Sequence, residues 1–313
     1  MARRRKGTPI HGWLILDKPL GPSSSGCVGK LKWLTGAQKA GHGGTLDPLA
    51  SGVLPIAFGE ATKTSSYAMD GSKTYEFDVT WGTSTATCDA EGDVIAASDA
   101  RPDEDQIKAA LPTFIGEIDQ IPPKFSAIKI DGKRAYELAR KGEEVEIKPR
   151  PVTIHDFRLV KVIDLNTVSF EVDCGKGTYV RSLARDLALH LGCEGHISRL
   201  RRTAVGPFHI EKAVTLAAFE DNEGEDAASL LTQYLLSVET VLDDIPALAL
   251  TDQEAQKLRH GQGIPVLPVA QRSSLRDGRI SQGDVVQVTA NGSLVALARI
   301  TGGEIRPVRV MNF

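Results

Sequence analysis

The stretch from Gly41 to Pro55 reads Gly-His-Gly-Gly-Thr-Leu-Asp-Pro-Leu-Ala-Ser-Gly-Val-Leu-Pro and constrains the fold more than any other part of the chain. Its four glycines and two prolines exclude a regular helix or a central strand. Pro48 biases Asp47 toward an extended backbone, so we expect a stiff turn that presents one carboxylate. Such a turn suits a nucleophile or general base in a dry pocket. The alternative is an Asx-turn, in which Asp47 only caps its own backbone.

Apolar periodicity predicts a mixture of strands and helices around this turn. The clearest strand signal runs from Thr74 to Trp81, where apolar and polar residues alternate. The predicted strands cover residues 12–18, 74–81, 168–174, 284–289, 294–300 and 305–310. The predicted helices cover residues 24–35, 103–114, 180–191, 230–242 and 252–258. A linker near Pro246 precedes the strand-rich end of the chain, which therefore predicts a separate small β-barrel with an Asn-Gly hairpin at Asn291.

Composition limits the classes of partner and compartment. The chain has 313 residues and a net charge of −3, so any nucleic-acid surface must come from local segregation of cations. Its four cysteines are scattered without paired spacing, which favours a reducing compartment and hence a cytoplasmic location. The basic start is not followed by an apolar segment, so we expect neither a signal peptide nor a membrane span.

The spacing of His190, Cys193 and His196, three residues apart, raises the hypothesis of a metal site. Three such ligands can make an open zinc site. Gly192 and Gly195 interrupt the helix between them, however, and no His-x-Glu pattern accompanies them. We therefore expect no metal site here.

Several motifs resemble those of the TruB family of tRNA pseudouridine synthases. The string from Gly43 to Pro55 resembles that family's catalytic motif, with Ser51 where the family most often has Thr. Lys18-Pro19, Lys73-Thr74-Tyr75, Lys-Gly-Thr-Tyr-Val-Arg-Ser and His-Ile-Ser-Arg-Leu-Arg-Arg-Thr resemble further family motifs. The resemblance runs from about Gly12 to Val214, and more loosely to the C-terminus.

For the chemistry, the resemblance implies that Asp47 is the catalytic aspartate and that Arg181 pairs with it. It also implies that the ring of Tyr75 stacks on the target base and assists loss of the proton from its C5 atom. From the residues alone, plain core packing of Tyr75 and an exposed position for Arg181 remain open.

For substrate binding, the resemblance implies that Tyr179 and Leu200 line the base pocket, with Lys18 and Pro19 beneath the active-site loop. His42 is a flat side chain between two glycines and five residues before Asp47. It is therefore expected to fill the space that the target base leaves when it is flipped out of the RNA, a role that the resemblance supports. The alternative for His42 is a histidine hydrogen-bonded to the loop backbone. The alternative for Lys18 is a solvated lysine in a turn.

The implied fold is α+β, with a mixed, mostly antiparallel sheet flanked by helices. A catalytic domain is expected over residues 1–243, with an inserted RNA-contacting arm at about 124–151 that is rich in lysine and arginine. A PUA-like RNA-binding β-barrel is expected over residues 244–313; a purely structural appendage is the alternative.

The implied activity is isomerisation of uridine 55 in the T-arm loop of tRNA, by a monomer that needs no cofactor. Two other classes of function remain open. One is an Asp-dependent nucleoside glycosidase, although such enzymes usually pair two carboxylates and no second acid accompanies Asp47 in its motif. The other is a tRNA-binding or tRNA-folding module without catalysis. The sequence does not decide whether Asp47 would attack C1′ of the ribose or C6 of the base.

Overall fold

The computed structural model describes residues 7–126, 128–130, 133–135, 138, 147–222, 225–273 and 280–313. Much of the expected arm, including Arg140 and Lys141, lies outside these residues. Of the arm the structure describes a short hairpin, in which β8 (Lys129–Ile130) pairs with β9 (Lys133–Arg134). The contact of the arm with RNA therefore stays a prediction.

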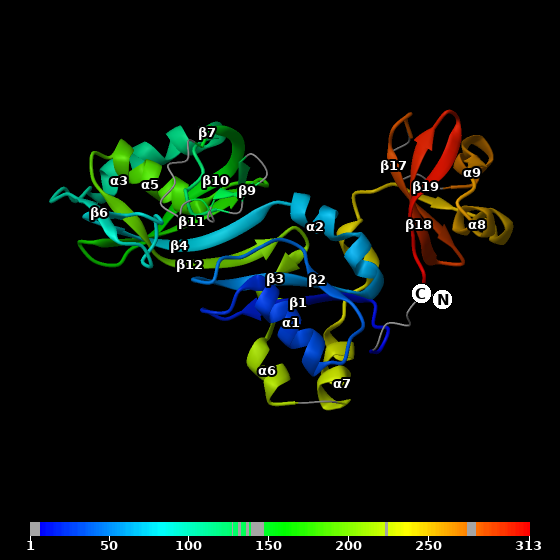
Figure 1. Ribbon diagram of the computed structural model, residues 1–313. Helices are drawn as coiled ribbons and strands as arrows, with labels where there is room; N and C mark the ends of the chain where they lie inside the picture. The colour runs from blue at the N-terminus through cyan, green and yellow to red at the C-terminus, as the bar shows by residue number, and fades with distance from the viewer. Residues whose placement is uncertain are drawn as a thin grey trace.

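A ten-stranded sheet forms the larger part of the fold, with the order β14-β1-β3-β12-β4-β11-β10-β7 (Figure 1). Strand β2 pairs with β3, and β13 pairs with β12. The expectation that residues 41–55 contain no central strand is wrong, because β3 (Ala50–Phe58) begins within them and lies between β1 and β12. The pairs β1/β14 and β3/β12 are parallel and the others are antiparallel, so the predicted mixed sheet is confirmed. The strands are β1 (Gly12–Lys18), β2 (Ala40–His42), β3 (Ala50–Phe58), β4 (Lys73–Trp81), β7 (Gly116–Gln120), β10 (Arg150–Val162), β11 (Thr167–Cys174), β12 (Gly195–Val205), β13 (Phe208–His209) and β14 (Val214–Thr215).

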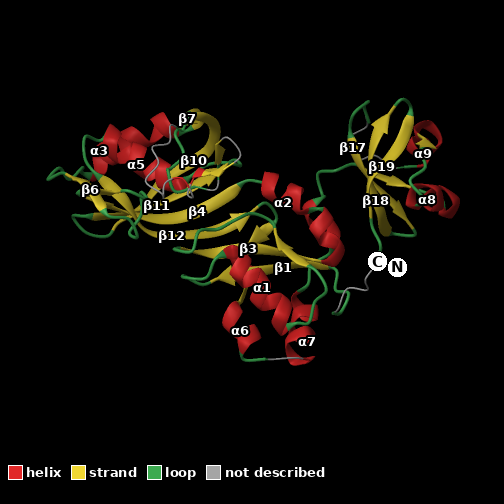
Figure 2. Cartoon of the chain, in the orientation of Figure 1, coloured by secondary structure: helices red, strands yellow, loops and turns green. Residues whose placement is uncertain are grey.

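Helices gather at both ends of this sheet (Figures 1 and 2). Near β1 lie α1 (Ser24–Leu34), α6 (Leu216–Glu220) and α7 (Glu225–Tyr234). Near β10 and β11 lie α3 (Glu104–Ala110) and α5 (Val180–His190). Shorter elements are η1 (Gly59–Lys63), α2 (Ser65–Asp70), β5 (Thr83–Thr85), β6 (Val94–Ala97), η2 (Leu111–Phe114), η3 (Ile210–Lys212) and η4 (Val238–Val241).

Local sequence signals explain most element boundaries. Helix α1 begins after Ser23, whose hydroxyl accepts a hydrogen bond from the Gly26 N–H, as expected for an N-cap. The single helix expected over residues 230–242 is wrong, because α7 ends at Tyr234 and η4 follows separately. Between them, Leu236 exchanges two backbone hydrogen bonds with Trp13 of β1, at 2.7 and 2.9 Å. Pairing of Leu236 with the edge of the sheet thus replaces the helical turn that local propensity favours.

The C-terminal part is a second, five-stranded sheet with the order β15-β17-β18-β19-β16. Its elements are β15 (Ala247–Ala249), α8 (Asp252–Arg259), β16 (Ile264–Pro265), α9 (Val266–Arg272), β17 (Val285–Ala290), β18 (Ser293–Thr301) and β19 (Glu304–Val310). The Asn-Gly hairpin is confirmed, since Asn291 and Gly292 both have positive φ. Within the described residues β15 and β16 are the two edge strands of this sheet. They do not pair with each other, so the sheet is a curled half-barrel and not a closed barrel.

This C-terminal sheet packs on the large one. Leu294, Leu297 and Met311 share a buried cluster with Trp13 and Phe208. The backbone N–H of Asn312 donates to Glu60 of η1 at 2.8 Å, which adds a polar contact at the same junction. In the part of the chain that the structure describes, no helix combines the length and apolar character needed to cross a bilayer.

Candidate active site

The loop between β2 and β3 carries Asp47, and each of its carbonyl groups from Gly44 to Pro48 accepts a hydrogen bond. The Gly44 and Thr45 carbonyls accept from Arg202, at 3.2 and 3.1 Å. The Leu46 carbonyl accepts from the Ser24 hydroxyl at 2.7 Å, and the Asp47 carbonyl accepts from the backbone N–H of residue 50 at 3.1 Å. The Pro48 carbonyl accepts from Lys18 at 3.2 Å. The loop is therefore fixed in place before any substrate arrives.

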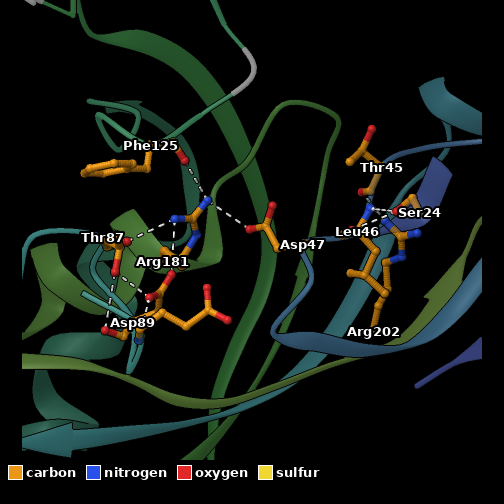
Figure 3. Close-up of polar contacts among 10 residues, drawn as sticks. Ser24, Thr45, Leu46, Asp47, Thr87, Asp89, Phe125, Arg181 and Arg202 are labelled. Carbon is orange, nitrogen blue, oxygen red and sulfur yellow. Dashed lines mark hydrogen bonds and ion pairs between the residues drawn. The ribbon is translucent and has the colours of Figure 1, made fainter. Parts of the chain in front are cut away.

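The carboxylate of Asp47 forms an ion pair with Arg181, with Oδ2 2.9 Å from Nη2 (Figure 3). Arg181 lies in the first turn of α5, and its side chain is only 6% exposed, whereas that of Asp47 is 38% exposed. The alternative of an exposed Arg181 is thus wrong. The ion pair therefore fixes the orientation of a carboxylate that stays reachable from the cavity.

A second carboxylate, from Asp89, lies on the far side of Arg181, with Oδ2 3.3 Å from Nη1. Its side chain is 1% exposed and accepts hydrogen bonds from the Thr87 hydroxyl and from the backbone N–H of Glu91. Arg181 also donates to the carbonyls of Thr87 and Phe125, at 3.0 and 3.1 Å. Figure 3 shows this guanidinium held between Asp47 and Asp89. Asp89 was not among the site residues expected from the sequence, because the residues around it read as a turn between strands.

Asp47 opens onto a cavity of about 940 Å³. Six of the eight site residues expected from the sequence line this cavity: His42, Asp47, Tyr75, Tyr179, Arg181 and Leu200. They come from five different elements or their edges, and β4, α5 and β12 supply most of them. The structure therefore brings together residues that are up to 158 positions apart in the chain.

Lys18 and Pro19 are not part of the cavity lining. The Lys18 side chain is fully buried, and its ammonium donates to the carbonyls of Pro19, Pro22 and Pro48 at 2.8 to 3.2 Å. All three hydrogens of the ammonium are thereby occupied. Lys18 thus contacts the active-site loop through the Pro48 carbonyl, and its part in substrate binding stays a prediction.

The rings in the cavity have shifted pKa values. Burial raises the pKa of Tyr75 and of Tyr179, so both phenols stay protonated at neutral pH. Burial, together with the charge of Arg202, lowers the pKa of His42, so its ring stays neutral. The buried Nδ1 of His42 has no hydrogen-bond partner among the described residues, which argues against a histidine bonded to the loop backbone.

The three candidate zinc ligands have separate surroundings. The ring of His190 meets Phe114 edge-on, at 5.6 Å between centroids. The Cys193 thiol donates to the carbonyl of residue 188, and Nδ1 of His196 lies 2.8 Å from the Thr83 carbonyl oxygen. No group of metal-binding side chains occurs within the described ranges.

Comparison with known proteins assigns this chain to a family. Residues 32–180 match the model of the TruB family pseudouridylate synthase N-terminal domain. Residues 181–243 match a tRNA pseudouridylate synthase B C-terminal domain, and residues 246–311 match a C-terminal domain of pseudouridine synthase II TruB. A curated relative from Rhodospirillum rubrum is 52% identical over 312 residues, covering 100% of both chains. The chain belongs to the TruB family.

Other TruB relatives and solved structures agree. The curated protein from Agrobacterium fabrum is 52% identical and covers 99% of this chain and 97% of its own. Both curated relatives carry the name tRNA pseudouridine synthase B. An archaeal box H/ACA sRNP Nop10–Cbf5 complex contains a chain with a TM-score of 0.73 and 26% identity, covering 99% of this chain and 92% of that one. A chain in an H/ACA RNP bound to a substrate RNA containing 2′-deoxyuridine has a TM-score of 0.72 and 25% identity, with coverage of 100% and 92%.

Proposed function

We propose that this chain is a tRNA pseudouridine synthase that isomerises uridine 55 in the T-arm loop, with Asp47 as its nucleophile. The observation that carries this proposal is the Asp47 carboxylate, held by a buried Arg181 at the wall of a cavity of about 940 Å³, on a loop whose carbonyl groups accept hydrogen bonds. The names of the full-length curated relatives support tRNA as the substrate.

The proposed reaction needs one nucleophile and the exclusion of water. The Asp47 carboxylate attacks C1′ of the ribose, and the electrons of the C1′–N1 bond leave with the uracil ring. The ring rotates, C5 bonds to C1′ and expels Asp47, and the C5 proton is lost while N1 gains one. Addition of Asp47 to C6 of the base is the other route. Atoms and electrons balance in either route without redox change or hydrolysis, so the chemistry requires no cofactor.

The other cavity residues have supporting roles in this proposal. Tyr75 stacks on the detached ring and assists transfer of the C5 proton, while Tyr179 and Leu200 limit the rotation of the ring and exclude water. His42 takes the place of the flipped uridine in the RNA stack, and its neutral ring suits this role because a neutral ring is easier to desolvate than a cation. Water exclusion decides the outcome, because water reaching C1′ would turn the isomerase into a glycosidase.

The glycosidase alternative requires two carboxylates that face the substrate. Besides Asp47, the carboxylates of Asp89 and Glu91 line the cavity. The Asp89 side chain is 1% exposed and both its oxygens are occupied, so it is a poor candidate for protonating a leaving group or activating water. Glu91 is exposed to solvent, so the measurement of released base decides between isomerisation and hydrolysis.

The remaining features of the proposal concern architecture and partners. The catalytic domain spans residues 1–243, and residues 244–313 form an accessory RNA-binding unit, which matches the division of strands between the two sheets. The protein acts as a cytoplasmic monomer on the T-arm stem-loop. Cations of the arm, such as Lys148 and Arg150, contact the phosphate backbone there.

One experiment separates the three functions. A T-arm hairpin labelled with tritium at C5 of the target uridine is incubated with the protein, and release of label and of free base are both measured. Isomerisation releases label without base, hydrolysis releases base, and a binding module releases neither. Release of free base in proportion to enzyme would refute the proposal.

A further inference from the structure

A second buried arginine flanks Asp47, on the opposite side of the loop from Arg181 (Figure 3). Arg202 lies in β12 and is 1% exposed, yet it lines the cavity. Its Nη1 and Nη2 donate to the carbonyls of Thr45 and Gly44, at 3.1 and 3.2 Å. Its Nε donates to the carbonyl of Val53 at 2.8 Å. One guanidinium thus joins the start of the loop to the strand that follows it.

Among the described residues no carboxylate neutralises the charge of Arg202, since none places an acidic oxygen within ion-pair distance of this guanidinium. Two other arginines of β12 do have carboxylate partners. Arg199 pairs with Asp78 at 2.7 Å, and Arg201 pairs with Asp17 at 2.9 Å. Burying an unpaired cation is costly, so a side chain placed in this way needs a compensating role. Neutral carbonyl groups, two of them in the loop beside Asp47, provide the contacts that retain it.

Room for this arginine is built into the adjoining strand. Arg202 is the parallel partner of Gly52 in β3. Gly52 has φ of +102°, and a Cβ on it would lie 2.1 Å from the backbone oxygen of Arg202. Only glycine allows this approach, which brings β12 close enough for the guanidinium to reach the loop.

Arg202 also faces the other two chemical groups of the cavity. It is the antiparallel partner of Tyr75 in β4, so both side chains project from the same face of the sheet. Its charge opposes the rise in the pKa of Tyr75 and contributes to the lowered pKa of His42. The loop of Asp47, the phenol of Tyr75 and the ring of His42 thus all border one buried cation.

We propose that Arg202 is a positioning residue of the isomerisation: its three carbonyl contacts fix the loop so that Asp47 meets the ribose of a base stacked on Tyr75. This inference rests on the proposed function. Arg181 fixes the carboxylate itself, whereas Arg202 fixes the backbone from which that carboxylate projects. Arg202 acts through the loop and needs no contact with RNA.

The kinetic test compares Arg202→Met and Arg202→Lys with the control Arg199→Gln, which removes a half-exposed cation from the same strand. Single-turnover tritium release and RNA affinity are measured on the full-length protein. We expect Arg202→Met to lower the rate at saturating RNA at least 100-fold, with the Kd for RNA changed less than threefold. We expect Arg202→Lys to fall in between, because its charge is kept but a single Nζ cannot replace Nε, Nη1 and Nη2, which reach the three carbonyls from separate positions on the planar guanidinium. Addition of guanidinium to Arg202→Ala should restore part of the rate.

A rate for Arg202→Met within threefold of the wild type, or a loss confined to RNA affinity, would overturn the proposal. So would a loss in Arg199→Gln as large as that in Arg202→Met. If Arg202→Met does not fold, Arg202→Lys decides the question, because its rate at saturating RNA must still fall without a matching change in Kd.

A second measurement does not depend on turnover. Amide hydrogen exchange in the free protein should accelerate over residues 43–47 in Arg202→Met and not in Arg199→Gln. The pKa of His42, followed by NMR, should rise toward its usual value of 6.5. Unchanged exchange in the loop would refute the positioning role, whatever the activity of the protein. Absence of tritium release from the wild-type protein would refute the proposed function and leave the positioning of the loop to be judged by the exchange.

Discussion

Ser24 offers the sharpest test of whether the rigidity of the loop matters for the chemistry. Its hydroxyl donates to the Leu46 carbonyl at 2.7 Å and accepts from the Leu46 N–H at 2.8 Å. Ser24 is 2% exposed, so Ser24→Ala leaves two backbone groups unpaired away from water, directly beside Asp47. Each such group costs about 1–3 kcal/mol, and partial relaxation brings the sum to about 2–4 kcal/mol.

This free energy must appear in one of two measurable quantities. If the loop moves so that the groups regain partners, Asp47 is displaced, and a loss of about 2–4 kcal/mol in transition-state stabilisation slows the reaction roughly 30- to 1000-fold. If the loop stays in place, the free energy of unfolding falls by the same amount. We expect the first outcome, because a loop yields more easily than the core beneath it. Single-turnover tritium release and urea denaturation measure the two quantities.

The neighbouring Ser23→Ala is the matched control. It removes the N-cap of α1 at about 1 kcal/mol of stability and leaves both groups of Leu46 paired. Should Ser24→Ala resemble Ser23→Ala in both rate and stability, the reasoning that links the loop contacts to catalysis would be refuted.

Three further outcomes are expected. Asp47→Asn should abolish pseudouridine formation while RNA affinity is retained, since binding rests mainly on phosphate contacts; more than a small residual rate would exclude Asp47 as the nucleophile. His42→Ala should slow the reaction on a structured T-arm by roughly tenfold or more, as expected for one lost stacking contact, and less on a loop whose target uridine is already unstacked. Equal losses on both RNAs would contradict the stacking role. Burial lowers the pKa of Lys73 from 10.5 to about 8, so the unfolded chain binds more protons in that interval. The contribution of Lys73 to the free energy of unfolding should therefore rise from pH 8 to 10.5, by up to roughly 3 kcal/mol. Urea titrations of the wild type and Lys73→Met isolate it as a difference, because the buried cysteines, whose raised pKa values act in the opposite direction, are common to both proteins.

Part of the cavity lining is predictable because its residues lie in strings that resemble motifs of the family. Asp47, Tyr75 and Arg181 each stand within such a string, so the resemblance assigns them to one site. The structure adds the distance of 2.9 Å between Asp47 and Arg181 and the burial of the arginine. Neither follows from periodicity, which describes one element at a time.

Other features are not predictable because they depend on contacts between distant segments. Asp89 reads as a turn residue, and only the fold places it behind Arg181. From the residues alone Lys18 is as compatible with a solvated lysine as with a buried one; the resemblance implies a place beneath the loop, and only the fold shows that the carbonyls of Pro22 and Pro48 converge on it. The helix expected over residues 230–242 fails for the same reason, since pairing with Trp13 outweighs local propensity.

The hydrogen bonds from Arg202 to the loop have a consequence for how the protein is made. They join residues 157 and 158 positions apart, and the ion pair of Asp47 with Arg181 spans nearly as much of the chain. Synthesis proceeds from the N-terminus, so the segment that bears the nucleophile leaves the ribosome long before the strand that shapes it. A nascent chain that ends before β12 carries Asp47 without its scaffold. Competence for the chemistry should therefore arise late and all at once, when the two halves of the large sheet join.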